Sequence, residues 1–289
     1  FCWNDAGLPD MHNLSWNSSN SFANGAYYRF YTQIGFCNEF IRKANESKLT
    51  DEEFPSKARF IAEARALRAL TYFHVIDIFG NASFVNENSV VGANPTYISR
   101  ASLFEFVEKE CQELLSGSAL PEAGESEYAR LDKSFVRMVL AKLYLNAEVY
   151  IGKAMWSECA ALAEQIMSDH PLHTTAVNEN NTPYEELFMA DNHQFFGKEI
   201  IFAVPQEAIK LNSYGATNYL IRAAIGGDMD PAAQGVGGGW GGLSLTAEFS
   251  DKFDLDNDAR AMFYTKYGKS IDDMYSFAST DVATMQTGY

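Results

Sequence analysis

The sequence predicts a mainly α-helical fold, in which a platform of paired helices carries a loop-rich region that contains short strands. Two observations support this prediction. Between residues 22 and 170, apolar side chains recur at helical spacing in five segments. After residue 171, glycines, turns and short apolar runs replace that periodicity. No apolar run approaches the length of about eighteen residues that a membrane-spanning helix needs, so no such helix is expected.

The elements are expected in the following order. Residues 1–21 are rich in Asn, Ser, Gly and Trp and lack periodicity, which indicates an ordered loop region and a candidate ligand surface. Ser102 and Glu105 have the spacing of a capping box, Asp132 suits a helix N-cap, and His170-Pro171 ends the last helix. The predicted helices lie at about 22–46, 51–79, 102–116, 132–151 and 154–169. The predicted divisions are therefore 1–21, a helical platform at 22–170 and a loop-rich elaboration at 171–289.

The second of these helices has the most informative sequence. Thr50 and Glu53 stand three apart before it, as in a capping box, and Gly80 suits the left-handed position beyond its end. The chain then continues into an extended segment, Ala82-Ser83-Phe84-Val85. One apolar face of the helix is formed by Phe60, Ala64, Leu67, Thr71, Val75 and Phe79. The pattern predicts a long core helix that is followed directly by a strand.

This helix resembles the signature helix of the SusD/RagB family, which are surface lipoproteins that capture nutrients for outer-membrane transporters in Bacteroidetes. The matching elements are Ala62-Glu63-Ala64-Arg65, Arg68-Ala69, Tyr72-Phe73, Phe79-Gly80 and Phe84-Val85. Three further stretches follow in the family's order. They are Lys133 to Ile166, with Ala141, Leu143, Tyr144, Leu145, Trp156 and Ala160; Tyr184 to Pro205, with Leu187, Phe188 and Glu199-Ile200-Ile201-Phe202; and Leu245 to Arg260, with Asp258. The resemblance covers nearly the whole chain from about residue 22.

The resemblance implies a tetratricopeptide-like helical repeat platform, an α/α superhelix, with a loop-rich elaboration. Ala69 with Tyr72, and Ala141 with Tyr144, have the small-then-aromatic spacing that such repeats use to bring two helices close together. Arg65 and Arg68 lie on the signature helix, where neighbouring Glu63 offers a charge partner, and we expect both to be structural. Because family members are longer, the chain is expected to be incomplete at both ends.

The function that the resemblance implies is non-catalytic capture of an extracellular oligosaccharide and its delivery to a SusC-like, TonB-dependent transporter. The expected location is the cell surface, at the outer membrane, through an N-terminal lipid anchor that is not present in this chain. No cofactor is expected. Two alternatives remain: RagB-like capture of a peptide for the same kind of transporter, and an intracellular repeat scaffold, which the long irregular C-terminal half disfavours.

The charge of the chain restricts its partners. The formal net charge is −16, and no basic stripe is present, which argues against nucleic acid or anionic lipid as a partner. The acidity serves either solubility alone or the exclusion of polyanionic ligands, which would favour neutral glycans or peptides.

The four cysteines are Cys2, Cys37, Cys111 and Cys159, and they form neither a CxxC pair nor a ligand-like spacing with histidine. Three of them lie within helical patterns, so buried free cysteines are expected. A disulfide remains an alternative in a cell-surface protein, and three pairings are open.

No catalytic motif or metal site is predicted. The chain lacks a Gly-x-Ser-x-Gly elbow, an HExxH helix and a phosphate-binding glycine loop. His170 and His173 are expected to be incidental loop residues, because Pro171 breaks the helix that would align them. Asp254, Asp256 and Asp258 imitate half of a calcium loop but lack its glycine and its terminal glutamate.

The candidate ligand-binding residues are aromatic and amide side chains in non-helical segments. An indole can stack on the apolar face of a sugar ring, whose hydroxyl groups then need amide or carboxylate partners. The glycine-rich segment 235–242 is predicted to be a flexible surface loop that presents one indole. The candidates are Trp3, Asn4, Asp5, Trp16, Asn17 and Trp240, with Asn13 and Asn20 close by. Trp156, in contrast, lies in a helical pattern and is expected in the core.

Overall fold

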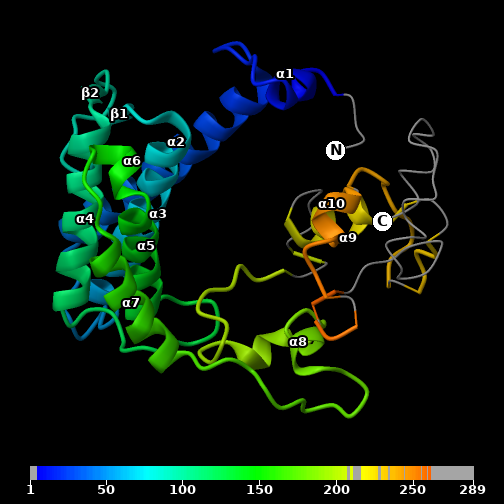
Figure 1. Cartoon of the computed structure of the whole chain (residues 1–289). Coiled ribbons are helices and arrows are strands. Elements are labelled where there is room, and N and C mark those ends of the chain that lie inside the picture. Colours follow the sequence, from blue (N-terminus) through cyan, green and yellow to red (C-terminus); the bar gives the residue numbers. More distant parts are fainter. Residues whose placement is uncertain are drawn as a thin grey trace. The chain divides into compact units, whose positions relative to one another are not determined.

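The structure is a computed structural model that describes residues 5–206, 209–210, 216–226, 229–233, 235–243, 245–254, 256–258 and 260–261 (Figure 1). The chain divides into two compact units. The first, here the platform unit, comprises Ser18–Ala176 and Glu186–Val204. The second, here the loop unit, comprises Phe1–Asn17, Val177–Glu185 and Pro205–Tyr289.

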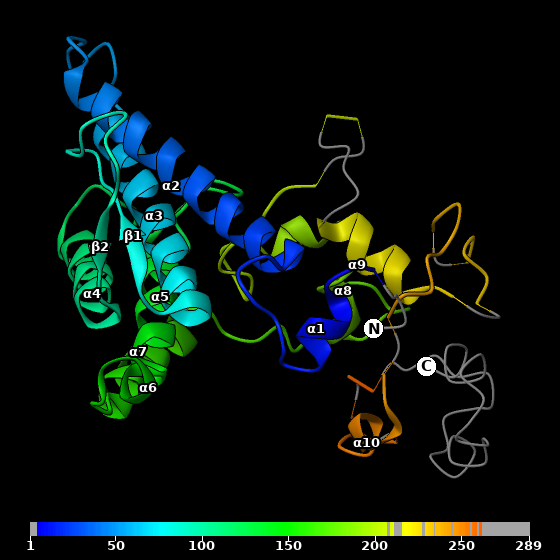
Figure 2. The ribbon, with the colours of Figure 1, turned by 90° about the horizontal axis from the view of Figure 1, so that it is seen from above.

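The platform unit is a stack of antiparallel helices with one small hairpin. Neighbouring helices along the chain pack on each other, and Figure 2 shows α2 lying along α3. Its helices are α2 (Ser21–Glu46), α3 (Lys57–Phe79), α4 (Arg100–Ser116), α5 (Lys133–Leu145), α6 (Ala147–Ile151) and α7 (Trp156–Asp169), followed by the 3₁₀ helix η1 (Asn192–Phe195). The helical platform predicted from periodicity is therefore confirmed.

Helix α3 is the centre of this unit, because α2, α4 and α5 all pack against it. Burial accordingly extends around most of the helix and includes Ala62, Ala69, Tyr72 and Ile76. The predicted start of the helix was six residues too early. Thr50 and Glu53 do form the reciprocal capping-box bonds, with Glu53 N donating to Thr50 Oγ1 over 3.2 Å. They cap only a short turn, since Pro55 follows and has no N–H to continue it.

The helix ends of the platform have identifiable caps. The Asn20 side chain accepts from the N–H groups of Phe22 and Ala23 and caps α2. Asp132 caps α5 in the same way, as predicted. Ser99, not Ser102, caps α4: its Oγ accepts the Ser102 N–H over 3.2 Å. Gly80 ends α3 with a φ of 74°. The predicted helix at 132–151 divides at Asn146 into α5 and α6.

The extended segment that follows α3 is strand β1 (Ala82–Phe84), which pairs antiparallel with β2 (Thr96–Ile98). Ala82 lies opposite Ile98 and Phe84 opposite Thr96. The chain beyond β1 is held by the buried Tyr72, whose hydroxyl group donates to the Val85 carbonyl over 2.6 Å and accepts its N–H. Burial raises the pKa of Tyr72 to about 12, so this hydroxyl group stays protonated.

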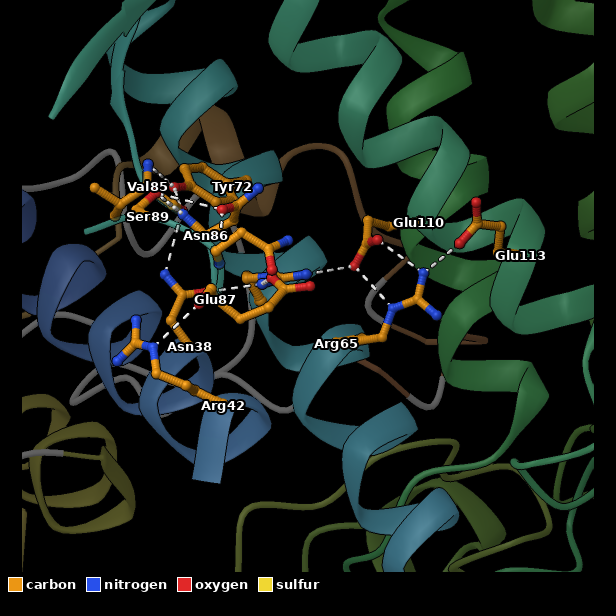
Figure 3. A network of polar contacts seen from close by, with 12 residues as sticks. Asn38, Arg42, Arg65, Tyr72, Val85, Asn86, Glu87, Ser89, Glu110 and Glu113 are labelled. Carbon is orange, nitrogen blue, oxygen red and sulfur yellow. Dashed lines mark hydrogen bonds and ion pairs between the residues drawn. The ribbon is translucent and has the colours of Figure 1, made fainter. Parts of the chain in front are cut away.

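A buried arginine ties the platform helices together (Figure 3). Arg68 of α3 is only 1% exposed and donates to Asn38 Oδ1 of α2 over 2.7 Å and to Glu110 Oε2 of α4 over 2.9 Å. It also pairs with Glu87, beyond β1. Arg65 donates to the same Glu110 carboxylate over 2.8 Å. The network thus connects three helices and the loop between β1 and β2.

The charge partners in this region differ from the prediction. Glu63 pairs with Arg59 and Arg130, not with Arg65 or Arg68. Burial acts to raise the pKa of Glu110, but the hydrogen bond from Arg65 and the charge of Arg68 outweigh it and lower the pKa. Glu110 is therefore ionised at neutral pH and balances both arginines.

Trp156 is not a core residue, contrary to the prediction. It is the first residue of α7 and is 59% exposed, whereas the preceding Met155 is buried. Helix α7 packs on α5, and of all its residues only Ile166 is buried. Periodicity identified the apolar stripe correctly, but it carries no information about whether a neighbouring helix covers that stripe.

The loop unit contains short elements, of which α1 (Leu8–His12), α9 (Ala216–Ala224) and α10 (Ala247–Ser250) are described. Residues 8–12 were predicted to be loop, and they form a helix that has Pro at its second position. Helix α8 (Pro183–Glu186) lies at the division between the two units. No helix within the described ranges combines the length and apolar character that crossing a membrane requires.

The cysteine prediction holds for the cysteines that the structure describes. Cys37, Cys111 and Cys159 are free, the first two are buried in helices, and burial raises the pKa of Cys111 to about 12. Cys2 lies outside the described residues.

Candidate functional site

The glycine-rich segment around Trp240 is anchored to the end of helix α9. The N–H groups of Trp240, Gly241 and Gly242 donate to the carbonyl groups of Arg222, Ile225 and Ala223 over 2.6, 2.9 and 2.8 Å. The last carbonyls of a helix have no partner within the helix, and this segment supplies their donors. The prediction of a freely flexible loop is therefore wrong for these residues: they form a backbone-anchored turn.

Glycine is required here because the two backbones approach closely. A Cβ atom at Gly239 would lie 2.1 Å from the Ile225 carbonyl oxygen, and one at Gly226 would lie 2.7 Å from Gly241 Cα. Neither contact is tolerable, so any side chain at these positions would displace the turn. At Gly237, in contrast, a Cβ would meet nothing within 4 Å. Gly226 and Gly239 therefore serve the close packing of the turn, whereas Gly237 borders open space.

The Trp240 indole lies half-buried beside Arg222. The guanidinium carbon is 5.5 Å from the centroid of the ring, within the range of a cation–π contact. Arg222 Nε donates to the Gly238 carbonyl oxygen over 2.8 Å, which fixes the plane of the guanidinium group. Local packing thus accounts for part of the burial of the indole, which the glycine-rich sequence around it did not suggest.

Sequence reasoning missed Arg222. The sequence does contain an indication of its importance, because Arg222 is the single basic residue between positions 211 and 251. Its meaning depends on the fold, since eighteen positions separate it from Trp240 and only the turn on α9 brings the two together.

The N-terminal candidates lie in the same loop unit. Trp16 is 48% exposed and follows α1, and Asn17 and Asp5 are also exposed. Trp3 and Asn4 lie outside the described residues. Trp16 and Trp240 lie on different segments, so they are two separate candidate contacts.

Two asparagines flank Trp16 in the sequence, and one of their side chains has a structural role. The Asn20 side chain caps α2 and is buried. Asn13 ends α1, and its backbone N–H donates to the Pro9 carbonyl over 2.9 Å. The Asn20 side chain is therefore no longer a candidate ligand contact.

The two histidines near α7 hold the end of the platform unit together. The His173 backbone N–H donates to Glu199 Oε2 over 2.5 Å, and His173 Nε2 lies 2.6 Å from Glu186 Oε2. His170 is buried, with Nδ1 against the Lys198 carbonyl group. Both histidines thus fasten residues 186–199, so they are structural and not incidental.

The acidic residues near the described end of the loop unit are engaged in local turns. Asp254 accepts from the Asn257 side chain over 2.9 Å, and Asp258 pairs with Arg260. Over the described ranges, no group of three or more His, Cys, Asp or Glu side chains is arranged to hold a metal ion.

Comparison with known proteins gives relatives of one kind. No family model matches the chain. The chain is similar to the starch-binding protein SusD of Bacteroides thetaiotaomicron, with 27% identity over 303 residues, which cover 97% of this chain and 52% of that protein. It therefore spans about half the length of this relative.

Two solved structures share the fold. One is a SusD-like protein of Bacteroides fragilis, with a TM-score of 0.60, 20% identity, and coverage of 83% of this chain and 43% of that one. The other was determined with a xylogluco-oligosaccharide, with a TM-score of 0.65, 20% identity, and coverage of 92% and 51%.

Proposed function

We propose that the chain is a member of the SusD/RagB family and that it captures an extracellular oligosaccharide without cleaving it. Two observations on relatives support the proposal. One relative is a starch-binding protein, and a structure of the same fold was determined with a xylogluco-oligosaccharide.

The observation that carries the proposal is the anchored indole of Trp240. Sugar sites combine an aromatic face with polar groups whose positions are already set before the ligand arrives. Here three backbone hydrogen bonds hold residues 240–242 on α9, so the position of the Trp240 backbone is set before a ligand arrives. The exposed Trp16, with Asp5 and Asn17, is a second candidate contact in the same unit.

The further steps of the function follow from the family resemblance. We propose that the protein is a cell-surface lipoprotein of the outer membrane. It passes its ligand to a SusC-like, TonB-dependent transporter, which it covers as a lid.

Peptide capture is the second candidate. Leu220 and Ile221 of α9 are exposed near Arg222, and such apolar side chains suit a peptide better than a sugar. The same binding experiment distinguishes the two ligands.

The test is calorimetric titration with a panel of neutral plant and storage oligosaccharides and a panel of short peptides. Trp240→Ala should weaken glycan binding roughly tenfold to a hundredfold, or about 1–3 kcal/mol for a partly exposed stacking contact. Trp156→Ala is the matched control, because it removes an exposed indole from the platform unit. Peptide binding without glycan binding would replace the proposal with its alternative. Equal affinities for the parent and Trp240→Ala would remove Trp240 from the site.

A further inference from the structure

Arg222 is an arginine whose orientation is fixed but whose terminal nitrogens donate to no residue that the structure describes. The indole of Trp240 lies against the guanidinium group, and the Nε–H donates to the Gly238 carbonyl oxygen. These two contacts fix both the position and the plane of the group. The two terminal nitrogens, Nη1 and Nη2, then form a fork with a defined direction.

Within the described ranges, no carboxylate fills this fork. Among the residues that the structure describes, Arg222 takes part in no ion pair, although the sequence holds 38 acidic and 22 basic residues. Arg260 in the same unit shows the contrast. It also lies near an aromatic ring, 5.9 Å from the Phe253 centroid, but Asp258 accepts from its Nε and its Nη2 over 2.9 and 2.7 Å.

The turn residue beside the fork is Gly238, which places no side chain there. Gly238 lies next to Nη2, where even an added Cβ would stand 3.5 Å away, and Gly237 borders open space. A planar guanidinium group binds a carboxylate through two parallel N–H···O bonds, which a lysine cannot reproduce. A fork that is already oriented loses little conformational freedom when it binds.

We propose that Arg222 binds the carboxylate of a uronic acid residue while the Trp240 indole contacts the same sugar. This inference rests on the proposed function and specifies its ligand: an oligosaccharide that carries a carboxylate. Two residues eighteen positions apart would then select the ligand. Trp240 supplies an apolar face for the sugar ring, and Arg222 supplies a directed positive charge for its carboxylate.

The net charge limits the kind of acidic glycan. A chain with a formal charge of −16 repels a dense polyanion. At physiological ionic strength, charges more than about 8 Å apart are largely screened, so one uronate at the fork feels mainly the guanidinium group. The ligand class is therefore a neutral glycan backbone with isolated uronate residues, not a polyuronate.

The experiment uses pairs of ligands that differ only in charge. Oligosaccharides of glucuronoxylan, of a glucuronic-acid-bearing arabinogalactan and of polygalacturonate are each titrated beside their carboxyl-reduced products, together with the neutral panel. A uronate-bearing oligosaccharide with a neutral backbone should bind about tenfold more tightly than its reduced product, since hydrogen bonds to a charged group are worth more than neutral ones. It should also bind more tightly than the polygalacturonate oligosaccharides.

The variants test whether Arg222 is responsible. Arg222→Gln keeps a donor for the Gly238 carbonyl group and should remove the preference for the carboxylate. Arg222→Lys should restore only part of it, because it returns the charge without the fork. Arg260→Gln is the matched control and should keep the preference, since its fork is already occupied by Asp258. Circular dichroism confirms that each variant is folded.

The outcomes separate this inference from the proposed function. Uronate and reduced ligands of equal affinity, binding to neutral oligosaccharides alone, or a carboxylate preference that survives Arg222→Gln would each overturn the role of Arg222. In those cases glycan capture still stands. If no glycan of any charge binds, the proposed function fails, and the inference fails with it.

Discussion

The buried Arg68 provides the sharpest test of how the platform is held together. We consider Arg68→Met, which keeps the length and apolar stem of the side chain but removes its charge and donors. Asn38 Oδ1, which accepts from Arg68 over 2.7 Å, and the Glu87 carboxylate then lose this donor. Glu110 keeps its bonds to Arg65.

The expected cost follows from these contacts. Breaking a buried ion pair on one side costs about 3–5 kcal/mol. The lower end applies here, because Glu87 is partly exposed and Glu110 remains paired. A loss of about 3 kcal/mol lowers the Tm of a unit of this size by roughly 6–12 °C. The assay is differential scanning calorimetry at pH 7.

Lys43→Met is the control, because Lys43 forms an exposed pair with Glu46 and its removal should leave Tm unchanged. An unchanged Tm in Arg68→Met would refute the structural role of the network. If ligand binding were lost at the same time, helix α3 would belong to a binding site.

Three further predictions concern stability and reactivity. Trp156→Ala should leave the Tm of the platform nearly unchanged, because the side chain is largely exposed. Burial, followed by the charge of Lys142, lowers the pKa of His74 below 6.5. Stability that is present above pH 6.5 should therefore be lost as the pH falls through the folded-state pKa, and His74→Gln should reduce this loss. Iodoacetamide should modify Cys159 before Cys111, whose pKa is raised by burial.

Each of these has a clear opposing result. A large fall in Tm for Trp156→Ala, measured by calorimetry, would mean that the indole is covered. If the Tm of the parent and of His74→Gln fell equally between pH 7 and pH 5, this histidine would not be responsible for the loss of stability at acid pH. Peptide mapping by mass spectrometry that found Cys111 modified first in the native protein would contradict its burial.

Helix positions were predictable from sequence because apolar periodicity reports directly which residues avoid water. The errors arose where a local signal competed with a neighbour. The capping box at Thr50 and Glu53 formed as predicted, but Pro55 ended its turn, and α3 began only at Lys57. The stripe on α7 was predicted correctly as apolar, yet the exposure of Trp156 depends on what packs against α7.

The candidate site was less predictable for a related reason. Trp240 was identifiable, since an indole among glycines has few local partners. Arg222 was not, because its importance comes from hydrogen bonds that join two segments of the loop unit. Long-range backbone pairing of this kind leaves no periodic pattern in the sequence. The buried charge network behaves similarly: the arginines of α3 were recognised, but their partners on α2 and α4 were not.

The central claim is capture of an oligosaccharide without chemical change, and one measurement tests it directly. The protein is titrated calorimetrically with its best-binding oligosaccharide, held at saturation for several hours, and the sugar is then recovered and its chain length is determined by chromatography. We predict saturable binding, a baseline that stays flat after each injection, and recovery of the sugar at its original length. Continuous heat release together with shortened products that persist after stringent purification would contradict the claim and show that the protein is an enzyme.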